Sequence, residues 1–346
     1  MTARGPAGRL AFLDGLRGLA LIFMVVNHTA RWWLGGPMSW PRYHLIYLSM
    51  VASAPIFLFL AGFSLALAYA RATVDRGLGR ARVALGFVRR GLGLILAGFA
   101  LTLLVFPTEP LLETGVLQTI GFGIVLLAPA LLVLDRPWAP TALVLLAAAL
   151  YASFALAQPV LRAWLAAHPT LAEIWFADYP LWPWLALLLV GAVLGRTWAL
   201  GARRGAAQAP AVAGAAAAGT ACLSAYVALE LSRGPVPHLA FTRDFVLNRH
   251  WTPAPITGLA VLGLVATVFA CAWWALEARR WRAGWLVLLG RHALLLYFAH
   301  QVIAFTLVRE WLGVTLESWW AYALANAALV AGLVLLARAR VALPRF

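Results

Sequence analysis

The sequence predicts an all-helical, polytopic integral membrane protein of about ten transmembrane helices, with both termini in the cytoplasm. Of its 346 residues, 64% are hydrophobic and only 11% are charged, and the mean hydropathy is +0.86. A soluble domain of this length needs a polar surface that so little charge cannot supply. Much of the apolar surface is therefore expected to face lipid.

Ten apolar runs are long enough for the predicted helices. A spanning helix needs about 20 mostly apolar residues. Runs bounded by charge, Pro or Gly lie near 13–34, 44–70, 83–106, 114–134, 140–158, 181–200, 208–232, 254–277, 284–308 and 317–337. The connections 159–180 and 233–253 are predicted to be long outer loops. No soluble domain fits between the runs, so one transmembrane domain over 1–346 is predicted.

The distribution of arginine predicts the orientation. All 27 basic residues are Arg, and an N-terminus in the cytoplasm places most of them in cytoplasmic segments, as the positive-inside rule requires. The net charge of +15 does not indicate a nucleic-acid partner, because no basic stripe with interleaved aromatic residues is present. We expect these arginines to contact the lipid bilayer. The bias towards Ala, Arg and Gly without Lys favours a bacterial inner (plasma) membrane.

Polar residues in the first apolar run are the strongest functional signal. Ionisable groups inside membrane helices are costly and usually face a cavity or one another. The 11-residue step from Arg17 to His28 returns to within about 20° of the same helix face, and Asp14 lies about 60° to one side. His28 lies about 16 Å beyond Arg17 along the axis. An Arg suits phosphate and a His suits proton abstraction. The alternative is an Asp14–Arg17 pair at the helix mouth and a His28 that is only hydrogen-bonded between helices.

A resemblance to a known family supports the catalytic interpretation. The segment RGLALIFMVVNH (17–28) resembles the first-helix signature of the membrane acyltransferase superfamily. This group includes the acyltransferase-3 enzymes and the heparan-alpha-glucosaminide N-acetyltransferase relatives. Four later stretches are similar to the second group and follow in its order: APIFLFLAGFSLAL (54–67), GVLQTIG (115–121), YPLWPWLALLLVGAVLGR (179–196) and LGRHALLLYFAHQ (289–301).

The resemblance implies transfer of an acyl group, usually acetyl, from cytosolic acetyl-CoA or another acyl-CoA. The acceptor would be a hydroxyl or amine of a glycan or a lipid-linked molecule at or across the membrane. It implies that His28 is the catalytic base or a transient acyl carrier, and that Arg17 is a structural or cofactor-binding arginine beside Asp14. Asn27 and His28 are adjacent, as in the acyltransferase-3 pattern. The lysosomal enzyme of the heparan-alpha-glucosaminide N-acetyltransferase group instead places its catalytic histidine farther past the corresponding Asn. His44 is therefore a rival for the role of the catalytic histidine, and Asn27 and His44 are candidates for substrate binding.

Further candidate residues lie in later segments. Arg89 and Arg90 could bind the phosphates of the coenzyme, or could only anchor the third helix. Gln118 could bond the thioester or bridge helices. A second spacing of an inner Arg and a deeper His, about 14 Å apart, indicates another group of site residues. The candidates of this group for cofactor or substrate binding are Arg291, His300 and Gln301, and Trp184 is a further substrate-binding candidate.

Two other classes of protein fit the same residues. A transporter or flippase for a small anionic or lipid-linked solute would line its path with the same Arg and His. A membrane scaffold would give no reason for the aligned polar stripe. No metal is predicted, because the seven His residues are dispersed and form no known ligand spacing. A homodimer is compatible with the sequence.

Overall fold

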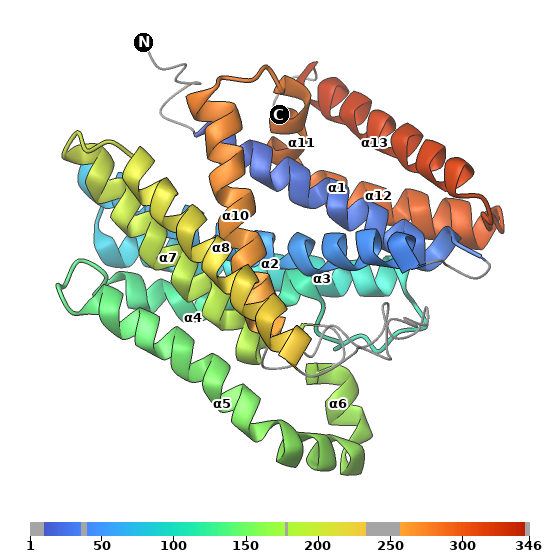
Figure 1. The fold of residues 1–346 in the computed structure, drawn as a ribbon, viewed down its shortest axis with the longest axis horizontal. Helices are drawn as coiled ribbons and strands as arrows, with labels where there is room; N and C mark the ends of the chain where they lie inside the picture. Colours follow the sequence, from blue (N-terminus) through green and yellow to red (C-terminus); the bar gives the residue numbers. More distant parts are fainter. Residues whose placement is uncertain (1–9, 36–39, 177–178, 233–256, 343–346) are drawn as a thin grey trace. The chain divides into compact units, whose positions relative to one another are not determined.

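The structure is built from helices, because a chain in lipid must satisfy its backbone hydrogen bonds within each segment. The computed structural model describes residues 10–35, 40–176, 179–232 and 257–342, shown in Figure 1. The first elements are α1 (Ala11–Trp33), α2 (Trp40–Ala70), the π-helical η2 (Arg71–Asp75), α3 (Arg80–Val105), α4 (Val116–Leu131), α5 (Ala139–Ala167), α6 (Pro169–Phe176) and α7 (Leu181–Arg203). They are followed by α8 (Ala209–Ser232), α10 (Thr257–Trp273), η3 (Trp274–Ala278), α11 (Gly284–Arg291), α12 (Ala293–Gln301), η4 (Val302–Trp311) and α13 (Trp319–Ala342).

The helices confirm a polytopic integral membrane protein. Within the described residues, nine helical segments are long and apolar enough to span a membrane, and α4 is a shorter apolar helix. Large apolar side chains point outwards along them: Leu104 is 75% exposed and Leu156 is 82% exposed. Contiguous apolar surface of this kind is unusual for a soluble monomer. The cytoplasmic position of the termini stays a prediction.

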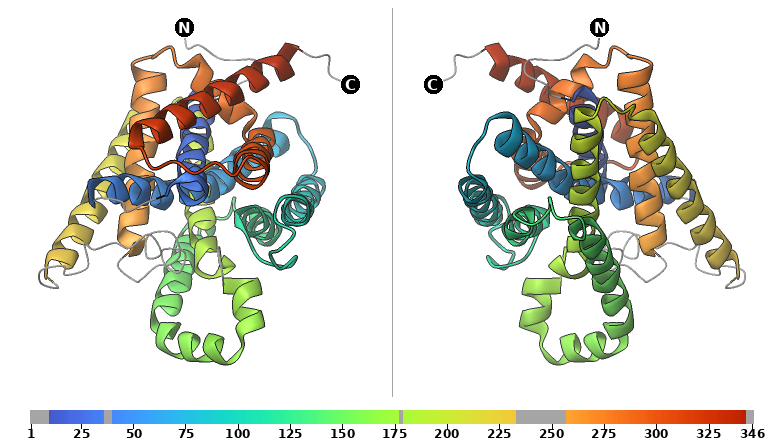
Figure 2. Two further views of the ribbon diagram at one scale, coloured as in Figure 1. Left: turned by 90° about the vertical axis from the view of Figure 1, so that its right-hand side faces the viewer. Right: turned by 90° about the vertical axis from the view of Figure 1, so that its left-hand side faces the viewer.

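Two predicted segments differ from the structure, and a third cannot be compared with it. The run 284–308 is not one helix, because α11 ends at Arg291 and α12 begins at Ala293 after a break at His292. The predicted loop 159–180 is largely helical, since α5 continues to Ala167 and α6 follows it. In Figure 2, α6 turns back beside the end of α5. The second predicted outer loop, 233–253, lies outside the described residues.

The described helices group into two units, and each is considered by itself. The first contains α1, the beginning of α2, most of α8, and the chain from residue 259 onwards. In this unit α1 packs against α11, α12, η4 and α13. Glycines also bring α8 close to α10, since a Cβ at Gly219 would lie 3.0 Å from the carbonyl oxygen of Gly263. One domain over 1–346 stays a prediction, because grouping by contact does not define an independently folding unit.

The second unit contains the rest of α2 and continues through α7. Here α3 packs along α4, and α5 along α7, as Figures 1 and 2 show. Gly191 and Gly195 of α7 form a G-x-x-x-G motif against the backbone of Phe59 and Phe63 in α2. Small residues at this spacing let two membrane helices approach closely. α7 then ends in a left-handed Gly205, whose φ is +68°, in a Schellman-type cap.

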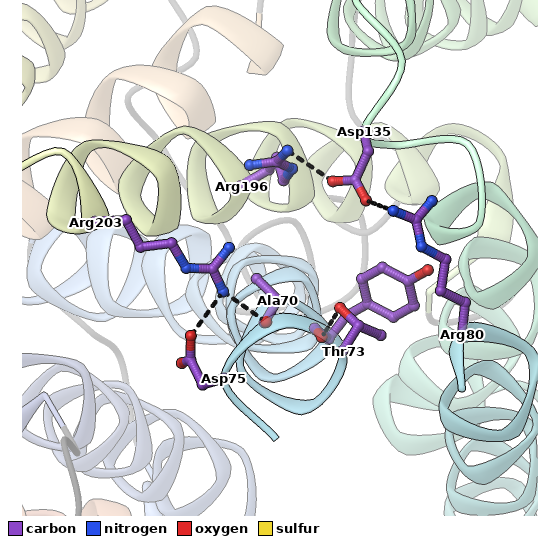
Figure 3. A network of polar contacts seen from close by, with 8 residues as sticks. Ala70, Thr73, Asp75, Arg80, Asp135, Arg196 and Arg203 are labelled. Carbon is purple, nitrogen blue, oxygen red and sulfur yellow. Dashed lines mark hydrogen bonds and ion pairs between the residues drawn. The ribbon is translucent and has the colours of Figure 1, made fainter. Parts of the chain in front are cut away.

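A network of ion pairs ties the helix ends of this second unit (Figure 3). Asp135, in the connection after α4, accepts from Arg80 at 2.9 Å and from Arg196 at 2.6 Å. Arg203 lies 3.2 Å from Asp75. The network therefore links η2, α3 and α7 to the α4–α5 connection. The sequence assigns these arginines only to membrane orientation, and their pairing is a finding of the structure.

Candidate active site

Two glycines bring α1 and α11 into close backbone contact in the first unit, and a third brings α1 against η3. A Cβ at Gly290 would meet the carbonyl oxygen of Asp14, and a Cβ at Gly18 would meet the carbonyl oxygen of Leu286. A Cβ at Gly15 would meet the side chain of Leu276. With no side chain in the way, the polar residues of α1 can reach those at the end of α11. Glycine is required here for space and not for an unusual backbone conformation.

Asp14 joins the two arginines of this region. Its carboxylate accepts a hydrogen bond from Arg17 Nη1 at 2.6 Å, and its other oxygen lies 3.5 Å from Arg291 Nε. Asp14 is 1% exposed, whereas the Arg17 and Arg291 side chains are 23% and 38% exposed. Two guanidinium groups and one carboxylate leave a net charge of about +1. This inner cluster could hold an anionic group on its exposed side.

His28 and His300 form the second polar feature of the first unit. His28 Nδ1 and His300 Nε2 are 2.9 Å apart, within hydrogen-bond distance. The ring centroids are 5.1 Å apart and the ring planes are 20° from parallel, so the two rings meet edge to edge through these nitrogens. His300 is fully buried, whereas His28 is partly exposed. The buried ring thus supports a ring that a substrate could reach.

A hydrogen-bonded cluster around Thr29 fixes this part of α1 to α13. Thr29 Oγ1 donates to Asn326 Oδ1 at 2.7 Å, and the Tyr322 hydroxyl donates to the carbonyl of Val26. Asn326 Nδ2 in turn donates to the Tyr322 carbonyl at 2.9 Å. Thr29 is the next residue after His28, so the cluster restrains the backbone that carries the partly exposed histidine.

The two segments that carry the site have the same chain order. In α1 an arginine of the inner cluster is followed by His28, and in α11 and α12 Arg291 is followed by His300. Asp14 contacts Arg291 and His28 contacts His300. The two segments therefore touch at the inner cluster and again at the histidine pair. The π-helical η4 starts two residues after His300. Such widened helices are frequent at functional sites.

The remaining predicted site residues have varied surroundings. Asn27 and Gln301 are buried in the first unit, next in sequence to the two histidines. His44 belongs to α2, but its side chain lies outside the described part of the structure. These three residues stay candidates for substrate binding.

The other predicted residues lie in the second unit. Arg89 and Arg90 are exposed on α3. Gln118 is buried, donates from Nε2 to the Glu113 carbonyl at 3.3 Å, and packs under Gly98 of α3. Trp184 is buried against Tyr179, with ring centroids 5.7 Å apart. The packing of Gln118 agrees with its alternative role as a bridge between helices.

The structure adds residues that the sequence analysis does not single out. Thr29, Tyr322 and Asn326 support the histidine pair. The signal for them in the sequence is that Tyr322 and Asn326 lie four residues apart, on one helix face of the last apolar run. The contact of His28 with His300 is likewise not predicted. Its signal is the repeated spacing of an inner Arg and a deeper His. Among the described residues, no three His, Cys, Asp or Glu side chains form a potential metal site, and the absence of a metal stays a prediction.

These features define a polytopic integral membrane protein with a polar site among the helices of one unit. The family described as "Heparan-alpha-glucosaminide N-acetyltransferase, catalytic" matches residues 9–231, which is more than half of the chain. The chain therefore belongs to this family of membrane acetyltransferase catalytic domains, and the resemblance stated from its motifs is confirmed. A comparison with curated proteins finds no match. The matched region includes Asp14, Arg17 and His28, whereas Arg291 and His300 follow it in the chain.

Proposed function

We propose that this protein transfers an acetyl group from acetyl-CoA to a hydroxyl or amine of a glycan or lipid-linked acceptor, in the inner membrane of a bacterium. The observation that carries the proposal is a partly exposed His28, inside the matched acetyltransferase region, held by a hydrogen bond to His300. A histidine with one side open and the other fixed is suited to proton transfer. Family membership supports the transferase class, and the donor and acceptor are part of the proposal.

The chemistry asks little of the protein beyond positioning and proton transfer, because a thioester is already activated. In the direct route, His28 takes a proton from the acceptor while the acceptor's oxygen or nitrogen bonds to the carbonyl carbon of the thioester. The carbon–sulfur bond breaks, and the coenzyme thiolate takes the proton back from His28. In the alternative route, His28 attacks the thioester, releases the thiolate and holds the acetyl group until the acceptor reacts. That route gives ping-pong kinetics.

The donor's negative charge fits the inner cluster. Arg17 and Arg291 lie beside the Asp14 carboxylate and are both partly exposed, and guanidinium groups suit a phosphate or the developing oxyanion. In the predicted orientation this cluster faces the cytoplasm, where acyl-CoA is found. Arg89 and Arg90 are exposed on α3 of the second unit and stay separate candidates for binding the phosphates of a coenzyme. Gln118 is a weaker candidate, because Gly98 and the Glu113 carbonyl already contact its side chain.

Transfer of radiolabelled acetyl from acetyl-CoA in membranes that contain the protein tests this proposal. We expect labelled product with the wild type and a loss of about 10²- to 10⁴-fold in His28→Ala, the range for removal of a general base. The matched control is His168→Ala, which removes an exposed histidine that stacks on Trp164 between α5 and α6. A control variant that loses as much activity as His28→Ala would contradict the role of His28.

Transport is the second reading of the same polar residues. Wild-type protein that accumulates an unmodified solute in proteoliposomes, without saturable binding of acetyl-CoA, would overturn the transferase proposal. Label on the protein itself in the absence of acceptor, lost in His28→Ala, would select the acetyl-histidine route. No protein label, with product still formed, would select direct transfer.

A further inference from the structure

The two hydrogen bonds of His300 determine where its protons are. Its Nδ1 lies 3.1 Å from the backbone carbonyl of Leu296, one turn earlier in α12. A carbonyl oxygen can only accept, so this nitrogen must carry a hydrogen. Its other nitrogen, Nε2, lies 2.9 Å from His28 Nδ1. In a neutral imidazole with hydrogen on Nδ1, Nε2 has a lone pair and no hydrogen.

The proton position on His300 then decides that on His28. Because His300 Nε2 can only accept, the 2.9 Å contact needs a hydrogen on His28 Nδ1. A neutral His28 with hydrogen on Nδ1 has its lone pair on Nε2. If His300 Nε2 instead donated to His28 Nδ1, His300 would carry a hydrogen on both ring nitrogens and a positive charge. That residue is fully buried, and among the described contacts the rings within 6 Å of it are His28 and Tyr297. A charge there would be expensive.

We infer that His300 is a positioning residue that fixes the tautomer of His28, so that His28 Nε2 is the atom that takes the acceptor's proton or carries the acetyl group. This inference deepens the proposed function and rests on it. The chain of bonds runs from the Leu296 carbonyl through His300 to His28 Nδ1, so it does not use His28 Nε2. His300 itself touches no reacting atom.

The arrangement gives His28 the correct atom and orientation before substrate binds. A histidine free to change tautomer would have its lone pair on the required nitrogen for only part of the time. The hydrogen bond to the buried His300 ring also restricts rotation of His28. When Nε2 gains a proton or an acetyl group, the ring becomes cationic, and the Nδ1–H bond to His300 becomes stronger. The same contact therefore serves both routes.

The full-length protein in lipid nanodiscs, labelled with ¹⁵N at histidine, allows a direct test. The ¹⁵N resonances distinguish a protonated ring nitrogen from a bare one, and the His28 signals are those lost in His28→Gln. In the wild type we expect a protonated Nδ1 and a bare Nε2. His300→Leu, which has similar volume and no ring nitrogen, should give a mixture of tautomers. A wild-type His28 with hydrogen on Nε2 would overturn the inference.

Kinetics of the same variants give the second measurement. In His300→Leu we expect kcat to fall about 10- to 100-fold, the usual loss when a histidine loses its orienting partner, with an unchanged KM for acetyl-CoA. His300→Gln should lose less than about 10-fold, because its amide oxygen can still accept from His28 Nδ1. Equal losses in the Leu and Gln variants would contradict the inference. If the wild type shows the expected His28 tautomer but transfers no acetyl group, the proposed function is overturned and the hydrogen-bond assignment is supported.

Discussion

Replacement of Gly290 by alanine tests whether the close contact of α1 and α11 assembles the inner cluster. A Cβ at Gly290 would lie 2.6 Å from the carbonyl carbon of Asp14 and 2.9 Å from the nitrogen of Gly18, with the carbonyl oxygen of Asp14 closer still. Ordinary contacts begin at 3.4 Å. All three atoms belong to the backbone, so no side-chain rotation can relieve the overlap. The two helices must therefore separate by about 1 Å.

Gly284→Ala is the matched control for this substitution. It lies in the first turn of the same helix and meets nothing within 4 Å. Both variants gain from the lower backbone entropy of alanine, so their difference isolates the overlap. Overpacking of this kind costs about 1–3 kcal/mol. We expect Gly290→Ala to melt about 2–10 °C below Gly284→Ala.

Acetyl transfer by the two variants extends the test to the site. A separation of about 1 Å would stretch the Asp14–Arg291 contact from 3.5 Å beyond ion-pair distance, and activity should fall with stability. Scanning fluorimetry in detergent measures the melting temperature, and the labelled-acetyl assay measures transfer. If Gly290→Ala has the same melting temperature as Gly284→Ala and transfers acetyl at the wild-type rate, the packing of α1 on α11 does not position this cluster.

Two further substitutions test the polar contacts that support each unit. Thr29→Val leaves the buried Asn326 Oδ1 without its donor, so it should destabilise the protein by about 1–3 kcal/mol. Thr197→Val, which removes an exposed hydroxyl bonded only to its own helix, should have little effect in the same melting experiment, and equal shifts would contradict this reading. Asp135→Asn leaves Arg196, 11% exposed, without its carboxylate. The free energy of unfolding should fall by about 1–3 kcal/mol, between the values for surface and buried ion pairs. No measurable loss would show that the network of Figure 3 does not stabilise this unit.

The sequence predicts the helices well because spanning a bilayer sets their length and apolar character. Its errors occur where that requirement does not apply. Charge and proline after residue 157 indicate a loop, but α5 and α6 continue the helical backbone there. The run 284–308 is mostly apolar and contains no Pro, so composition alone does not reveal the break at His292 or the π-helical turns after Gln301.

The sequence predicts the single residues of the site and offers the local Asp14–Arg17 pair, which the structure contains, but it does not predict the pairs between distant segments. Helical periodicity places Arg17 and His28 on one face, because that relation is local. The distant partners of Asp14 and His28 come from a segment more than 250 residues later, and periodicity contains no information on which helix faces which. The glycines that permit the close approach are visible in the sequence, but glycine is common in membrane helices. Only the structure shows that Gly290 meets Asp14.

The position of His300 after the matched region changes how the family relationship applies to this chain. Residues 9–231 contain His28, but the hydrogen-bond acceptor for its Nδ1 is supplied by α12. The carboxylate of Asp14 likewise lies in the matched region and reaches Arg291 beyond it. His28 and the inner cluster thus each contact a residue of the C-terminal helices. Under the proposed function, we therefore expect the activity of the matched segment to depend on α11, on α12 and on the glycine contacts between α11 and α1.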